Sequence, residues 1–317
     1  MTNNRVPFVT LDVFTAKGFE GNPLAVVETT HNEVSSQKMQ TIAREFNFSE
    51  TVFLDRRDVS HPRIRIFTPV NEMALAGHPL IGTGHVLFRR LLPNAGDPTT
   101  TVQKKMSVET KAGMVAIEYN SDTMSVAADI PHNVHIHSHH TPKDRILHTQ
   151  PALLADEASA GMKQEFPTVS IVCGVTYVLV DLTDLSDLFA AVSAGNSPII
   201  DLDDGWGPSF AGTMFYKLLA VENDKNTVVH NLQVRMVAIG LEDPACGSGC
   251  CSLAAYLALQ DGKQGGKYRF DFNQGSEMGR NSNLRVDILL NNEGNEVATV
   301  QLSGQGAPVA EGTIILP

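Results

Sequence analysis

The stretch Leu241–Gln260 reads LEDPACGSGCCSLAAYLALQ and decides the local fold around it. The preceding residues VRMVAIGL have the apolar, β-branched character of a strand, and the spacing of apolar residues after the glycines predicts a helix. A glycine-bearing turn between strand and helix leaves the first N–H groups of the helix without intrahelical partners. With the helix dipole, these groups favour an anion. The stretch therefore predicts an anion-binding helix N-terminus.

An earlier part of the chain repeats this pattern at a constant offset of 170 residues. Strand, glycine-bearing turn, helix and hairpin occur in the same order around RIFTPVNEMALAGHPLIGTGHVL and around LEDPACGSG. The alignment places Glu72 on Glu242, Ala76 on Cys246, Gly77 on Gly247 and His78 on Ser248. Such a repeat favours two related halves, each with one helix N-terminus.

The composition is that of a soluble globular enzyme. A chain of 317 residues is long enough for about two domains. Its net charge of −11 has no basic block and would repel a phosphate backbone, so we expect no nucleic-acid partner. No run approaches the roughly 18 apolar residues that span a bilayer, and the first residues lack the pattern of a signal peptide. We therefore expect no membrane partner and a cytoplasmic location.

The cysteines and histidines suggest metal or disulfide chemistry only weakly. Cys173, Cys246, Cys250 and Cys251 are too few for a disulfide framework in a chain of this size. Five histidines fall in the segment 132–140: His132, His135, His137, His139 and His140. We interpret this segment as a solvated crossover between the halves that binds nickel or zinc adventitiously, and expect no functional metal site. His85, on a mostly apolar helix, is interpreted as a packing or surface residue.

DPACGSG also resembles the S-adenosylmethionine loop of amino-methyltransferases. Enzymes of that class that methylate an amine carry an (Asp or Asn)-Pro-Pro-aromatic loop as well, and this chain has no Pro-Pro pair. The loop also lies too near the end of the chain for the remaining strands of a doubly wound sheet. A methyltransferase therefore stays a minor alternative.

Five blocks along nearly the whole chain resemble the PhzF-like family of phenazine-biosynthesis isomerases. They are DVFTAKGFEGNPLAVV, FSETVFL, RIFTPVNEMALAGHPLIGTGHVL, EDPACGSG and QGSEMGRNS. The resemblance implies the α+β fold of diaminopimelate epimerase: two pseudo-symmetric halves, each a mixed sheet curled around a central helix, with the active site in the cleft between them. We expect an N-terminal half at 1–128, completed by a C-terminal strand at about 303–317, and a C-terminal half at 129–302. The family also implies a homodimer.

The resemblance implies roles for individual residues. Glu50 matches the general acid/base, His78 its polarising partner, and Asp243 a catalytic residue that orients the substrate. Substrate-binding positions fall on four residues of the two helix starts, namely Gly77, Gly247, Ser248 and Cys246. No external cofactor is implied. A single carboxylate suits this chemistry, because it can remove a proton from one carbon and return it to another on the same face when a dry pocket raises its pKa.

Cys246 departs from the family, in which threonine is common at this position. One interpretation is a reactive thiol with a pKa lowered by the helix N-terminus. The other, which we favour, is a small residue in a packed turn. Ala76 occupies the equivalent position of the first half. Because position 76 has no thiol, a racemase that uses one cysteine from each half is excluded. An epimerase that pairs Glu50 with Cys246 stays open.

These observations predict a cofactor-independent isomerase that moves a proton on a small carboxylate-bearing substrate through Glu50. The identity of the substrate is not set by membership of a family, because pockets change on a retained fold. The alternative from a different class is a non-catalytic protein that binds small anions at the same helix ends. Each matched residue also has a structural alternative: Glu50 as a charge at a strand edge, His78 as a polar residue at a helix start next to Pro79, and Asp243 and Ser248 as capping residues.

Overall fold

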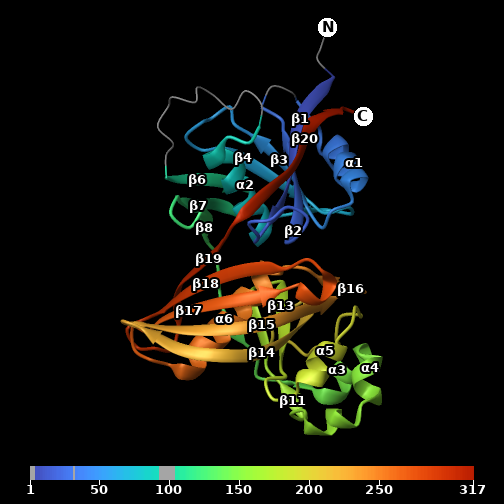
Figure 1. Ribbon diagram of the computed structural model, residues 1–317, viewed down its shortest axis with the longest axis vertical. Helices are drawn as coiled ribbons and strands as arrows, with labels where there is room; N and C mark the ends of the chain where they lie inside the picture. Colours follow the sequence, from blue (N-terminus) through green and yellow to red (C-terminus); the bar gives the residue numbers. More distant parts are fainter. Residues whose placement is uncertain (1–3, 31–32, 93–103) are drawn as a thin grey trace. The chain divides into compact units, whose positions relative to one another are not determined.

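The computed structural model describes residues 4–30, 33–92 and 104–317 of the chain (Figure 1). These residues form two compact units: Met1–Asp129 with Ser303–Pro317, and Ile130–Leu302. Each unit has its own set of hydrogen-bonded strands and its own buried helix. The predicted α+β class is confirmed.

The first unit is a mixed sheet to which the C-terminal strand is added. Its strands are β1 (Arg5–Val13), β2 (Asn22–Glu28), β3 (Thr51–Asp55), β4 (Arg63–Phe67), β5 (Glu72–Met73), β6 (Lys105–Thr110), β7 (Gly113–Asn120), β8 (Ser125–Asp129) and β20 (Gly306–Ile315). Hydrogen bonding joins them in the order β20-β1-β2-β3-β4-β6-β7-β8, and β5 forms a short hairpin with β4. The pairs β2·β3 and β4·β6 are parallel, and the others are antiparallel.

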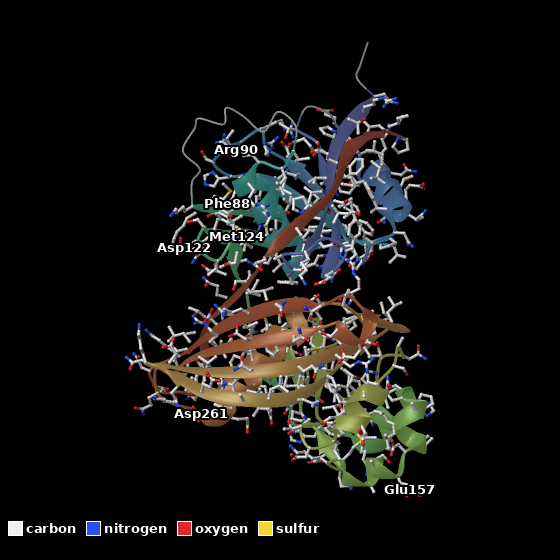
Figure 2. The ribbon with its side chains drawn as sticks, in the orientation of Figure 1. Phe88, Arg90, Asp122, Met124, Glu157 and Asp261 are labelled. Carbon is white, nitrogen blue, oxygen red and sulfur yellow. The ribbon has the colours of Figure 1, made fainter. Side chains whose placement is uncertain are left out.

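Two helices accompany this sheet. Helix α1 (Ser36–Phe46) begins where the Ser35 side chain accepts a hydrogen bond from the N–H of Lys38, and it ends at Asn47 in the left-handed conformation. Helix α2 (Gly77–Arg89) is buried along most of its length and is the central helix of the unit. Gly82 lets α2 approach the sheet, since a Cβ there would lie 2.4 Å from Leu24. Phe88 near the end of α2 and Arg90 at its C-cap are labelled in Figure 2.

The second unit repeats this architecture with an added helical layer. Its strands are β9 (His135–Ile136), β10 (Thr141–Pro142), β11 (Glu165–Phe166), β12 (Thr168–Val172), β13 (Val175–Asp181), β14 (Phe210–Asp224), β15 (Thr227–Ala238), β16 (Leu241–Asp243), β17 (Lys267–Gln274), β18 (Ser282–Leu290) and β19 (Val297–Gly304). The main sheet runs β9-β12-β13-β14-β15-β17-β18, and β10 pairs with β11 separately. The central helix is α6 (Gly247–Asp261), which ends at Gly262 in the left-handed conformation and is most extensively buried in its first three turns. Its last residue, Asp261, is labelled in Figure 2.

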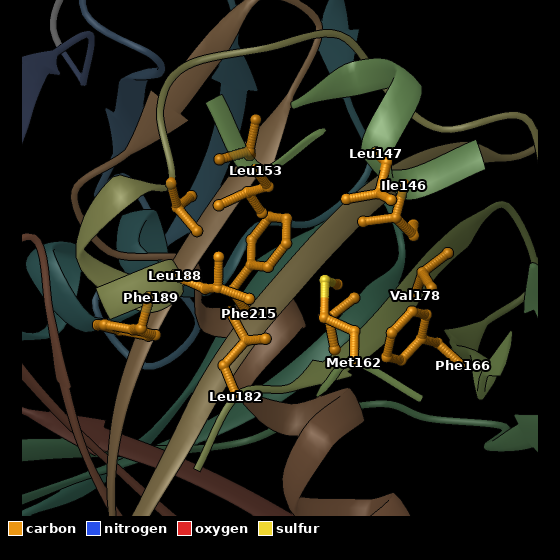
Figure 3. Close-up of a cluster of buried hydrophobic side chains, with 13 residues drawn as sticks. Ile146, Leu147, Leu153, Met162, Phe166, Val178, Leu182, Leu188, Phe189 and Phe215 are labelled. Carbon is orange, nitrogen blue, oxygen red and sulfur yellow. The ribbon is translucent and has the colours of Figure 1, made fainter. Parts of the chain in front are cut away.

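Three short helices between β10 and β14 enclose a separate apolar cluster. They are α3 (Lys143–Thr149), α4 (Pro151–Ala155) and α5 (Ser186–Ala191). Figure 3 shows Ile146 and Leu147 of α3 and Leu188 of α5 around Phe215 of β14. No helix was expected here from the sequence. The burial of this cluster explains why helices of only five to seven residues persist, since such lengths are marginal without tertiary packing.

The strand register confirms the internal repeat. In the first unit Phe67 of β4 faces Glu72 of β5, and in the second Val237 of β15 faces Glu242 of β16, each 170 positions further along the chain. The order of antiparallel and parallel pairs from β1 to β7 recurs from β12 to β18. The helices start at Gly77 and Gly247, with the same offset. Both halves are therefore built on one topology.

Among the described residues, no helix combines the length and the apolar character that crossing a membrane requires.

Candidate active site

Glu50 stands at the entrance to β3 in the first unit. The chain leaves α1 at Asn47 and reaches Glu50 one residue before the strand begins. Its side chain is only 15% exposed. Burial raises the pKa of the Glu50 carboxyl, and a hydrogen bond with the Ser49 side chain opposes this shift in part. A carboxyl with a raised pKa is suited to accept a proton and to give it back near neutral pH.

His78 lies beside Glu50 at the start of α2. Its Nε2 is 3.5 Å from Oε2 of Glu50, and its side chain is 7% exposed. The separation exceeds that of an ordinary hydrogen bond but is short enough for the imidazole to influence the carboxylate. Ala76, in extended conformation, precedes the helix and provides no side-chain cap. The N-terminus of α2, the His78 imidazole and the buried Glu50 carboxyl therefore lie close together in space.

The turn before α6 is held by side chains from several elements of the second unit. The Asp243 carboxylate accepts a hydrogen bond of 2.9 Å from the N–H of Ala245. Gln274, fully buried at the end of β17, donates to the carbonyl of Asp243 at 2.7 Å and accepts from the N–H of Cys246 at 3.1 Å. Gln274 thus fixes the backbone on both sides of the Asp243–Cys246 turn.

Tyr177 of β13 connects the first residues of α6. Its hydroxyl lies 2.7 Å from Oγ of Ser248 and 3.2 Å from Sγ of Cys246. Burial raises the pKa of this phenol well above its usual value, and the neighbouring Cys246 raises it further. Tyr177 therefore keeps its proton and serves as a neutral hydrogen-bonding group that orients the Ser248 hydroxyl.

Cys246 caps α6 through its sulfur. Sγ accepts a hydrogen bond from the N–H of Gly249 at 3.4 Å, and the residue is 5% exposed. Burial, with the negative charge of Asp243, raises the pKa of the thiol to about 12. The helix N-terminus does not overcome this desolvation. The environment thus supports a protonated packing residue and opposes a reactive thiolate.

The repeat shows that only the first unit carries a carboxylate at the Glu50 position. Thr51 pairs with Phe67 in the first unit, and Thr213 pairs with Val237 in the second, so Gly212 is the counterpart of Glu50. A Cβ at Gly212 would lie 2.9 Å from the Tyr177 ring. The tyrosine therefore occupies the space into which a second carboxylate would extend.

The structure thus brings Glu50 together with His78, and Cys246 together with Ser248, while Asp243 is linked to Cys246 through Gln274. The first pair belongs to one unit and the other three residues to the second. Sequence reasoning missed Tyr177 and Gln274. Gln274 could have been found, because it begins the block QGSEMGRNS, whereas nothing in the strand VTYVLVD distinguishes Tyr177.

The histidine-rich segment is not the solvated linker that the sequence suggested. His137 is fully buried, and His135 belongs to β9, which pairs with β12. Only His139 and His140 are exposed. The first part of the segment thus forms strand β9, which pairs with β12 of the second unit. The alternation of histidines with apolar residues could have indicated a strand here. His85 is fully buried, with Nε2 3.1 Å from the carbonyl of Gly304, so it is a packing residue.

Comparison with known proteins identifies relatives of this fold. In fold, the chain is similar to a Bacillus anthracis phenazine biosynthesis protein of the PhzF family, with a TM-score of 0.73 and 20% identity over 98% of this chain and 99% of that one. It is also similar to a hydroxyproline epimerase from Agrobacterium vitis, with a TM-score of 0.56 and 14% identity over 98% and 91% of the two chains.

A curated relative shares more of the sequence. The trans-2,3-dihydro-3-hydroxyanthranilate isomerase of Pseudomonas aeruginosa is 31% identical over 313 residues, which cover 98% of this chain and 99% of the relative. The protein is thus an isomerase with an epimerase-like α+β fold. Residues 11–312 match the family described as phenazine biosynthesis-like protein, and the chain belongs to that family.

Proposed function

We propose that the protein is a cofactor-independent isomerase that moves a proton on a small carboxylate-bearing substrate through Glu50. The observation that carries this proposal is the buried Glu50 carboxyl, with a raised pKa, 3.5 Å from His78. The counterpart of Glu50 in the second unit is Gly212, so one carboxylate is available for proton transfer at the two related positions. A single carboxylate suits the transfer of a proton between two carbons on one face.

The proposed reaction needs no oxidant and no second substrate. The Glu50 carboxylate takes a proton from a carbon, and the electron pair of the broken C–H bond moves into the neighbouring unsaturated system of the substrate. The carboxylic acid then gives a proton to another carbon of that system, and exchange of the Glu50 proton with solvent before this transfer brings solvent deuterium into the product. Atoms and electrons balance within the substrate, and Glu50 ends in its starting state.

The remaining residues bind and orient the substrate in this proposal. His78 polarises the group that takes up negative charge while the proton is on Glu50. The N–H groups at the starts of α2 and α6, at Gly77 and Gly247, receive carboxylate or carbonyl oxygens. Asp243 and Ser248 position the substrate, and Ser248 is held in place by Tyr177 at 2.7 Å.

An epimerase that pairs Glu50 with Cys246 is less well supported. Inversion requires an acid and a base on opposite faces of the carbon, and a thiol with a pKa of about 12 gives up its proton poorly near neutrality. The alternative of a non-catalytic binding protein predicts that ligands bind without exchange of protons at carbon. Deuterium exchange at carbon separates catalysis from mere binding, and Cys246→Ser separates the isomerase from the epimerase.

Glu50→Gln tests the proposal directly. The substitution keeps the volume of the side chain and removes its titratable group. We expect proton transfer to fall by at least ~10²-fold, the usual contribution of a general acid/base. Mass spectrometry would follow deuterium uptake at carbon when trans-2,3-dihydro-3-hydroxyanthranilate and other small carboxylates are incubated with the protein in heavy water.

The matched control is Glu45→Gln, which makes the same change on an exposed carboxylate of α1. This variant should exchange deuterium at the wild-type rate. Wild-type exchange by Glu50→Gln would refute the role of Glu50. Tight binding of a carboxylate by the wild-type protein with neither deuterium exchange nor an isomerised product would identify it as a binding protein instead.

Two properties of the whole protein complete the proposal. We propose that it acts in the cytoplasm and assembles as a homodimer, as the family resemblance implies. Light scattering coupled to gel filtration would give the mass of the particle. A mass near 34.3 kDa, that of one chain, would contradict the dimer.

A further inference from the structure

A cluster of metal-ligating atoms lies in the second unit, whereas Glu50 and His78, the residues assigned to proton transfer, belong to the first. One ring nitrogen each of His135 and His137 and a carboxylate oxygen of Asp203 all lie within 4.8 Å of one another. His135 belongs to β9, His137 follows that strand, and Asp203 lies in the segment between α5 and β14. Two separate parts of the unit therefore bring their ligand atoms together, and the proposed reaction uses none of them.

The separations between these atoms are close to those of a zinc site. Nε2 of His135 is 2.7 Å from Oδ2 of Asp203, and Nδ1 of His137 is 3.8 Å from the same oxygen. Ligand atoms about 2.0–2.1 Å from a tetrahedral zinc ion are roughly 3.3 Å apart. The two separations lie on either side of that value. The Asp203 carboxylate also accepts hydrogen bonds from the N–H and Oγ of Ser138, so it has to shift within these contacts to admit an ion.

Hydrogen bonding sets His137 in the form that a metal ligand requires. The backbone N–H of Asp203 donates to Nδ1 of His137 at 3.1 Å, so Nδ1 carries a lone pair and Nε2 carries the proton. That proton is directed to the buried Ser170 hydroxyl, 2.9 Å from Nε2. A ligating histidine typically donates its second N–H to such a partner, which fixes the ring. The same arrangement prevents His137 from acting as a base toward Ser170.

The remaining contacts orient the other ligands. The His135 ring stacks on Trp206, with ring centroids 4.5 Å apart and an interplanar angle of 10°. His139 is exposed and lies outside the cluster, although its Nδ1 is 3.8 Å from the second oxygen of Asp203. Two imidazoles with one carboxylate are a donor set typical of zinc.

We propose that His135, His137 and Asp203 bind a zinc ion that ties β9 to the Asp203 segment. The ion would be structural, since its ligands join two parts of one unit. Binding replaces two hydrogen bonds by metal bonds, the one from the Asp203 N–H to Nδ1 of His137 and the one from Nε2–H of His135 to Asp203. The loss of both lowers the affinity below that of a preformed site. The inference is independent of the proposed isomerase activity.

Trp206, the single tryptophan of the chain, is a built-in reporter because it stacks on His135. The untagged full-length protein, stripped with a chelator, would be titrated with zinc while tryptophan fluorescence and binding heat are recorded. We expect one ion per chain with a Kd below about 10 µM and a fluorescence change that saturates at the same stoichiometry. Zinc should also raise the unfolding temperature.

Three variants decide whether this cluster is the site. Asp203→Asn and His135→Gln should each weaken zinc binding by at least ~10-fold. They leave the buried His137 in place, so they should remain folded. The matched control is His140→Gln, a neighbouring exposed histidine outside the cluster, and its affinity should stay within about 3-fold of the wild-type value.

Other outcomes would overturn the inference. Wild-type protein that binds no zinc below about 100 µM has no site of this kind. Zinc binding that survives both Asp203→Asn and His135→Gln, or that is lost in His140→Gln, is adventitious binding by surface histidines. Glu50→Gln should bind zinc normally, so failure of the isomerase proposal and failure of the zinc proposal can be told apart.

Discussion

The four cysteines differ in exposure, and this difference tests the environment of Cys246. Cys173 is exposed, whereas Cys246, Cys250 and Cys251 are buried. Burial raises the pKa of all three buried thiols, that of Cys246 to about 12. We expect one thiol per native chain to react quickly with an aromatic disulfide at neutral pH, and four after unfolding. Cys173→Ser should remove the fast reaction.

Turnover gives the second test of Cys246. Cys246→Ser should keep the cap on α6 and change turnover by only a few-fold, because proton transfer is assigned to Glu50. A second fast thiol that disappears in Cys246→Ser, or a serine variant that binds substrate but no longer turns it over, would show the thiol to be an acid/base. That result would assign the protein to the epimerases.

His85 makes stability depend on pH in a defined window. Burial lowers its pKa from 6.5 to about 4, opposed by the hydrogen bond to Gly304. The folded state therefore binds the proton less tightly than the unfolded chain. The titration of His85 therefore does not change the free energy of unfolding above about pH 6.5, and it lowers that free energy as the pH falls toward 4. The loss at the acidic end is about 3 kcal/mol.

Urea unfolding at pH 7 and pH 4 would measure this effect. His85→Gln keeps a donor for the Gly304 carbonyl and removes the titration. The variant should therefore lose less free energy of unfolding than wild type between the two pH values, by about 3 kcal/mol. Equal losses in both proteins would mean that His85 is protonated in the folded state at little cost.

At the scale of elements, the two hairpins that precede the central helices carry the same ion pair. Arg65 of β4 pairs with Glu72 of β5 at 2.7 Å, and Arg235 of β15 pairs with Glu242 of β16 at 2.7 Å. The first pair is 29% and 20% exposed, the second only 6% and 9%. Arg235 also donates to the carbonyl of Phe189 in α5, so α5 contributes to its burial.

The difference in burial predicts unequal costs for the same substitution. Glu242→Gln leaves a buried guanidinium without its counter-charge and should cost about 3–5 kcal/mol. Glu72→Gln removes a pair that solvent reaches and should cost about 1 kcal/mol or less. Thermal or urea unfolding would compare the two variants. Equal destabilisation would show that the α5 layer does not isolate Arg235 from water.

At the scale of the whole molecule, the C-terminal segment completes the first unit. Strand β20 pairs with β1 along its whole length, from Arg5 opposite Ile315 to Val13 opposite Gly306, and Gly304 accepts the hydrogen bond of His85 (Figure 1). Deletion of residues 303–317 should expose the edge of β1 and destabilise the first unit far more than the second.

Hydrogen exchange read by mass spectrometry would locate the effect of this deletion. Peptides from β1 and α2 should lose protection, while peptides from β15 and α6 should keep it. The control is removal of the exposed Pro317 alone, which should change neither set. Equal loss of protection in both units would show that they unfold as one cooperative body.

Local sequence determined the elements and their order. Ser35 begins α1 because its hydroxyl caps the helix, and the two glycine-bearing turns at Gly77 and Gly247 open helices 170 residues apart. Capping, turn formation and hydrophobic periodicity act over a few residues, so sequence reveals them directly. Glu50, His78, Asp243 and Ser248 could be named only because the blocks that contain them resemble those of the PhzF-like family.

Contacts between distant residues were decided by the tertiary structure alone. Tyr177 meets Ser248 and Cys246, Gln274 holds the turn at Asp243, and Asp203 meets His135, each across at least 28 positions of chain. The raised pKa values of Glu50 and Cys246 likewise come from burial by side chains that folding brings around them. A sequence records which groups are present, but desolvation and partners depend on packing, which is why the same histidine type is exposed at His139 and fully buried at His137.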